Sequence, residues 1–70
     1  MHRIRILEFL SKREKASIRE ISKNLHIPMS VVKSEVENLT KDGLVSVEDD
    51  NVKISERGVK ELQDAKRIRG

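Results

Sequence analysis

Hydrogen-bonding and cationic side chains recur at short intervals between residues 29 and 41. Ser30 and Ser34 carry hydroxyls that both donate and accept hydrogen bonds, and Lys33 carries an ammonium group. On a helix these groups would share a face that could bond base edges or phosphates, with Val31 against a thymine methyl group. An ordinary solvated helix face is the alternative interpretation. The candidate DNA-binding residues in this segment are Met29, Ser30, Val31, Lys33, Ser34 and Lys41.

Basic residues earlier in the chain add attraction to phosphate groups. Arg19 and Lys23 fall on the outer side of an expected helix whose start, at Ser17, favours an anion through free amides and the helix dipole. Met1 to Ser34 holds eight basic and three acidic residues, whereas Glu35 to Asp64 holds four basic and nine acidic ones. A polyanion should therefore approach the N-terminal half. Besides Arg19, the expected supporting contacts are Ser17, Lys12, Arg13 and Lys15, in a basic cluster that includes Arg3 and Arg5.

Residues for catalysis or metal binding are poorly placed. The chain has no cysteine, and its two histidines, His2 and His26, lack the spacing of metal ligands. The neighbouring Asp49 and Asp50 are typical of a turn, because nothing apolar beside them would raise a carboxyl pKa. The three glycines are isolated and form no phosphate-binding loop. We therefore expect no enzymatic activity, no metal and no cofactor.

The size and composition of the chain favour one small domain spanning residues 1–70. Apolar residues are 36% of the chain and include a single aromatic, Phe9, so the core must be aliphatic, with Phe9 at its edge. No apolar stretch is long enough to cross a membrane, and the N-terminal residues are too charged for a secretory signal. Together with the absence of cysteine, these features favour a cytoplasmic protein that does not contact membranes.

Apolar spacing predicts helices at about residues 3–13, 17–25, 29–41 and 55–67, with a hairpin over 44–54. Ser17 and Glu20 form the S-x-x-E pattern of a capping box, and Gly43 is the expected stop after the third helix. The apolar stripe of the last helix should include Val59, Leu62, Ala65 and Ile68. The predicted fold class is α+β, mostly α. It is a three-helix winged helix-turn-helix with a two-stranded wing and a C-terminal helix.

These segments resemble the winged-helix regulators of the MarR and ArsR type. The residues that carry the resemblance are Ile21-Ser22, Leu25-His26-Ile27, Pro28 with Val32, Leu39 with Gly43-Leu44-Val45, and Ile54-Ser55 with Gly58. The resemblance implies double-stranded DNA as the partner and regulation of transcription as the role. Three features depart from the family: His26 replaces a usual glycine, Pro28 replaces a capping serine, and the wing tip is acidic at Glu48, Asp49 and Asp50.

Two other functions fit the same residues. The acidic wing and the few cations of the third helix favour a protein-interaction module, and the last helix could pair with a second copy in a homodimer. The chain also looks like the N-terminal winged-helix region of phenylalanyl-tRNA synthetase alpha subunits, which have a similar Gly-Leu-Val strand and S-x-x-G helix. That resemblance implies a module related to RNA or tRNA.

Overall fold

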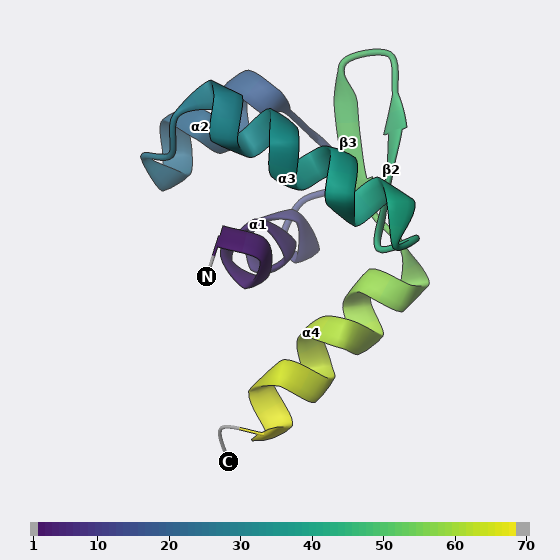
Figure 1. The fold of residues 1–70 in the computed structure, drawn as a ribbon. Helices are drawn as coiled ribbons and strands as arrows, with labels where there is room; N and C mark the ends of the chain where they lie inside the picture. The colour runs from purple at the N-terminus through teal and green to yellow at the C-terminus, as the bar shows by residue number, and fades with distance from the viewer. Residues whose placement is uncertain (1, 69–70) are drawn as a thin grey trace.

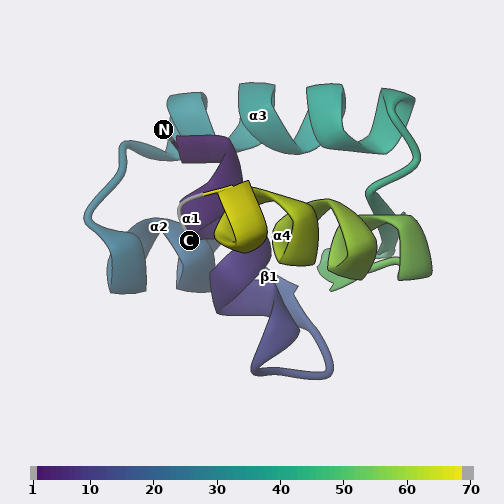
Figure 2. The same cartoon turned by 90° about the horizontal axis from the view of Figure 1, so that it is seen from below.

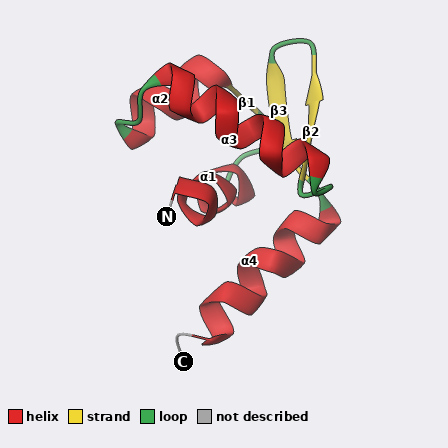
Figure 3. Ribbon diagram, viewed as in Figure 1, coloured by secondary structure: helices red, strands yellow, loops and turns green. Residues whose placement is uncertain are grey.

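The computed structural model describes residues 2–68 and contains four helices and a small sheet (Figures 1 and 3). The elements in chain order are α1 (His2–Ser11), β1 (Ala16–Ser17), α2 (Ile18–Leu25), α3 (Met29–Lys41), β2 (Val45–Glu48), β3 (Asn51–Ile54) and α4 (Glu56–Ile68). This is the predicted mostly helical α+β winged helix-turn-helix, with α2 and α3 as the helix-turn-helix and β2–β3 as the wing. No helix of the described residues is long and apolar enough to cross a membrane.

The boundaries of α2 follow from capping. The hydroxyl of Ser17 accepts a hydrogen bond from the backbone N–H of Glu20, and the Glu20 carboxylate accepts one from the N–H of Ser17, so the predicted capping box is present. The helix ends at His26, which adopts the left-handed conformation (φ 57°) and donates its N–H to the carbonyl of Ser22. His26 thus fills the helix-ending position that glycine commonly takes.

The first helix is shorter than predicted, ending at Ser11 and not at Arg13. The backbone N–H groups of Lys12 and Arg13 bond to the carbonyls of Phe9 and Leu10, three residues back. This tighter bonding closes the last turn, and the chain then extends into β1.

Helix α3 ends in a Schellman motif. Gly43 has a φ of 74°, its N–H bonds to the carbonyl of Thr40, and the N–H of Leu44 bonds to the carbonyl of Leu39. The left-handed residue therefore turns the chain out of the helix and into β2, as the sequence predicts for Gly43.

The sheet has three antiparallel strands in the order β1-β3-β2. In the wing, Val45 pairs with Ile54 and Glu48 with Asn51, which leaves Asp49 and Asp50 as a two-residue turn with Asp49 at a φ of 57°. The third strand, β1, pairs with β3 and was not predicted, because two residues carry no periodic signal. It attaches the start of α2 to the wing.

The core consists of aliphatic side chains from every helix and from all three strands. Among the described residues the buried hydrophobics are Ile6, Leu7, Leu10, Ala16, Ile21, Ile27, Val32, Val36, Leu39, Leu44, Val45, Val52 and Leu62. Phe9 is half-buried at the edge of this core, as expected. No buried side-chain nitrogen or oxygen in this part of the chain lacks a hydrogen-bond partner.

The last helix, α4, packs across α1 and extends away from the helix-turn-helix (Figures 1 and 2). Leu62 is buried, and Lys66 lies 3.4 Å from the carboxylate of Glu8 on α1. Val59, which belongs to the predicted apolar stripe of this helix, is 38% exposed. The side chain of Ile68, placed in the same predicted stripe, lies outside the described residues.

Substitution of Gly58 should test how closely α4 approaches the wing. A Cβ at this position would overlap the carbonyl oxygen of Leu44 and lie 2.7 Å from Cγ1 of Ile54. Because backbone cannot move aside as a flexible side chain can, Gly58→Ala should lower the free energy of unfolding by about 3 kcal/mol. Gly43→Ala, which meets only the end of Arg57 but must hold a left-handed backbone, should cost about 1 kcal/mol. Urea denaturation of both variants measures the difference, and equal losses would contradict the close packing.

Candidate nucleic-acid interface

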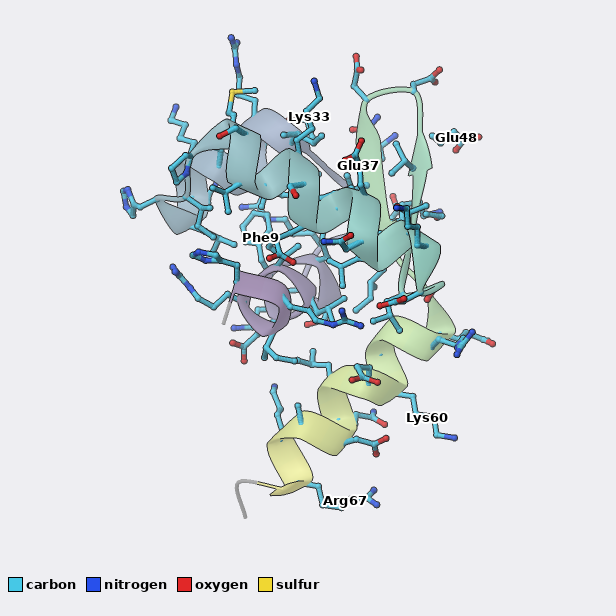
Figure 4. The ribbon with its side chains drawn as sticks, viewed as in Figure 1. Phe9, Lys33, Glu37, Glu48, Lys60 and Arg67 are labelled. Carbon is cyan, nitrogen blue, oxygen red and sulfur yellow. The ribbon has the colours of Figure 1, made fainter. Side chains whose placement is uncertain are left out.

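One side of α3 is free of packing contacts and faces the open space beside the wing. Val32, Val36 and Leu39 are buried. The exposed residues on the other side are Ser30, Lys33, Glu37 and Lys41. In Figure 4, Lys33 projects away from α1 and α4, on the side toward the wing. The N-terminal half of α3 is therefore presented outward, as a recognition helix requires.

A groove runs between α3, the start of α2 and the wing. We call it the α3–wing groove, and its volume is about 630 Å³ at the α2 end. Its floor is apolar, formed by half-buried Ile18 and by Met29 and Val47, which are 51% and 47% exposed. The remaining lining side chains are Ser17, Arg19, Ser30, Lys33, Asp49 and Asp50, and the groove continues past Val36, Glu37, Thr40 and Lys41.

The charges along this groove are mixed. Arg19, Lys33 and Lys41 supply three cations, and Glu37, Asp49 and Asp50 supply three carboxylates, two of them at the wing tip. None of these six side chains forms an ion pair within the described part of the chain. The groove thus offers positive charge on its helical walls and negative charge on the wing.

The structure brings together six of the predicted contact residues: Ser17, Arg19, Met29, Ser30, Lys33 and Lys41 all line the groove. Ser34 is exposed on α3 but does not line it. The expectation that Val31 is exposed is wrong, since it is half-buried and packs against the core. The branched side chain lies on the flank of α3, where it covers apolar neighbours.

The basic N-terminal cluster is largely engaged within the fold. Arg3 forms an ion pair with Asp42 at 2.7 Å, and Arg5 donates to the carbonyl of Leu25 at 2.9 Å, at the end of α2. Arg13 lies over the ring of Phe9, 4.4 Å from its centroid, and 3.8 Å from the carboxylate of Glu20. Lys12 and Lys15 are exposed and do not line the α3–wing groove. Arg3 and Arg5 therefore connect elements, a role that basic residue type alone did not indicate.

The sequence interpretation missed the apolar floor and the proximity of the wing tip to α3. Val47 carries a signal that identifies it, since it follows Val45 by two residues and so points to the same side of β2. Asp49 and Asp50 were identified as a turn, but their position beside Lys33 depends on how the wing folds back along α3.

Comparison with known proteins agrees with this geometry. The chain belongs to the winged helix-turn-helix DNA-binding family, whose pattern matches residues 2–46, from α1 to the start of the wing. The match is to this general family, so the finer resemblance to MarR and ArsR regulators stays a prediction.

A particular relative is the phenylalanine–tRNA ligase alpha subunit of Sulfurisphaera tokodaii. It is 38% identical to this chain over 64 residues, which are 87% of this chain and 14% of the subunit. The chain thus spans about one seventh of the length of that relative. This similarity agrees with the resemblance to synthetase alpha subunits that the sequence predicts.

The capping box at the groove gives a prediction about pH. Hydrogen bonding from the Ser17 backbone N–H lowers the pKa of the Glu20 carboxyl; the Ser17 hydroxyl and the nearby Arg13 act in the same direction. A carboxyl whose pKa is lowered by folding stabilises the folded state at pH values above its unfolded pKa, which is about 4.3, and loses that effect as the pH falls through the lowered value. Glu20→Gln should therefore melt below the parent at pH 7, with a gap that narrows as the pH falls from about 4.3.

Thermal melts at several pH values, with Glu61→Gln on exposed α4 as the matched control, measure this gap. A gap that stays constant with pH would contradict the role of the Glu20 charge. Ser17→Ala, which removes the capping hydroxyl itself, should cost about 1 kcal/mol at neutral pH.

Proposed function

We propose that this chain binds double-stranded DNA by placing α3 in the major groove, and that it acts in transcription regulation as a binding module without catalysis. The observation that carries the proposal is the outward presentation of Ser30 and Lys33 on the second helix of a helix-turn-helix. Membership of a DNA-binding family supports it. The major groove is about 12 Å wide and admits a helix of this kind.

The contacts follow from the positions of the side chains. The Ser30 hydroxyl and the Lys33 ammonium lie in the N-terminal half of α3, the part of a recognition helix that meets base edges. Arg19 stands at the start of α2, where it reaches the phosphate backbone beside the groove. The hydroxyl of Ser17 lines the groove and accepts the capping hydrogen bond from the backbone N–H of Glu20, so the start of α2 is held in place beside a bound phosphate.

The affinity should be modest and dependent on salt. Three cations line the α3–wing groove, and each phosphate contact contributes about −0.9 to the slope of log K against log salt. A slope of about −2.7 is therefore expected from the groove alone, with dissociation constants on the order of micromolar for the monomer.

Substitution of Lys33 tests the proposal directly. Lys33→Gln should weaken binding to a labelled duplex of about 20 base pairs by about tenfold at 50 mM salt, because one phosphate or base contact is lost. The matched control is Lys60→Gln, which removes the same charge from α4, on the far side of the molecule from the groove (Figure 4). Fluorescence anisotropy measures both affinities.

Both lysines are exposed, so neither substitution should change the melting temperature by more than a degree or two. Equal effects of the two substitutions would indicate attraction to net charge alone and would overturn the placement of α3 in the groove.

Structured RNA is the second candidate ligand, and the similarity to a phenylalanine–tRNA ligase subunit favours it. The groove would then contact a tRNA, the molecule that the name of the relative specifies. Competition between the labelled DNA duplex and an unmodified tRNA transcript separates the candidates. Displacement of the duplex by the transcript at a tenfold lower concentration than by unlabelled duplex would favour RNA, and the reverse order would favour DNA.

A further inference from the structure

We propose that the bound nucleic acid follows the outer face of α2 and not the wing, so that phosphates are held by Arg13, Arg19 and Lys23. This inference rests on the proposed function, because it names the path that the backbone takes after it leaves the α3–wing groove. The two possible paths lie on opposite sides of the recognition surface. Figure 1 shows α2 beside the N-terminal half of α3 and the wing beside its C-terminal half.

The wing offers an unfavourable surface to phosphates. Its tip consists of Glu48, Asp49 and Asp50, three consecutive carboxylates that are all exposed. The wing has one cation, Lys53 on β3, and this side chain does not line the groove. A phosphate backbone along the wing would therefore lie beside charges of its own sign. Such repulsion weakens binding, whereas an opposite charge would strengthen it.

The outer face of α2 carries the opposite balance. A hollow of about 580 Å³ is lined by Arg13, Arg19, Glu20, Lys23, Asn24 and His26. It contains three cationic side chains and one carboxylate, and Arg13 lies 3.8 Å from that carboxylate. We call this surface the α2 hollow. Its charge suits a phosphate backbone better than the balanced charge of the α3–wing groove does.

The α2 hollow and the groove adjoin at Arg19, which lines both of them. A strand that places its bases against Ser30 and Lys33 lies beside the wing tip within the groove, but it moves away from the wing carboxylates as it continues past Arg19 to Lys23, because no wing residue lines the α2 hollow.

Arg19 and Lys23, two of the cations of the α2 hollow, stand on a well-anchored helix. The capping box fixes the start of α2, and Arg5 from α1 bonds to the carbonyl of Leu25 at its last residue. Arg13 rests on the ring of Phe9 at 4.4 Å, which restricts the directions its guanidinium can take. Binding to phosphate would thus require little further ordering of the α2 backbone or of the Arg13 guanidinium.

Two lysines provide a matched test. Lys23 on α2 and Lys53 on the wing are both exposed and form no ion pair among the described residues, so Lys23→Gln and Lys53→Gln remove the same charge from the two paths. Binding to a labelled 20-base-pair DNA duplex is measured by anisotropy between 50 and 200 mM salt. Lys23→Gln should weaken binding by about tenfold at 50 mM and make the salt slope about 0.9 less steep, whereas Lys53→Gln should change affinity less than twofold.

A larger effect of Lys53→Gln, or equal effects of both substitutions, would overturn the path across α2. Failure of the proposed function is distinguishable, because then Lys33→Gln would match its control Lys60→Gln whatever the α2 variants do.

A second measurement does not depend on affinity. The chain has no cysteine, so Lys23→Cys and Lys53→Cys each offer one thiol for a photo-activated cross-linker. Cross-links to the duplex from position 23 but not from position 53 are expected, and the reverse pattern would overturn the inference.

Discussion

The chain between α3 and β2 passes through two residues, Gly43 and Leu44, on which three elements converge. Gly43 ends α3 with a left-handed turn, and the N–H of Leu44 closes the Schellman motif onto Leu39. The carbonyl of Leu44 accepts the N–H of Ser55, and the Ser55 hydroxyl donates to the carbonyl of Gly43 at 2.7 Å. Because Gly58 packs against the carbonyl of Leu44, the directions of α3, the wing and α4 are set together.

The consequence for function is that the angle between α3 and the wing depends on hydrogen bonds of the backbone and of the Ser55 hydroxyl, and these bonds involve no charged side chain. Surface residues can therefore vary without disturbing the frame. In this chain the exposed residues give an acidic wing tip and a basic hollow beside α2. A winged helix with this arrangement has the fold of its family, but α2 attracts phosphates and the wing tip repels them. Such separation between frame and surface is why the fold alone does not determine the ligand.

Sequence reasoning succeeded where local chemistry decides the structure. The bounds of α3, the capping box of α2 and the helix-ending role of Gly43 all follow from residues within a few positions of one another. It failed where distant segments meet. The strand β1 exists because β3 lies beside it, the exposure of Val59 depends on how α4 packs, and Arg3 pairs with Asp42 across 39 positions. The composition of the groove also depends on distant segments, since Val47 and Asp49 lie near α3 only because of the way the wing folds.

The short strand β1 has one more consequence. Ala16 pairs with Val52 and Ser17 with Asn51, immediately before α2 begins, so backbone hydrogen bonds join the α2 side of the groove to the wing side. A ligand cannot move the start of α2 away from the wing without breaking this backbone pairing. The backbone on these two sides of the groove is therefore already in place before a ligand binds. Little conformational entropy is lost on binding, so a small number of contacts suffices for measurable affinity, and ligands are selected by whether their shape already fits.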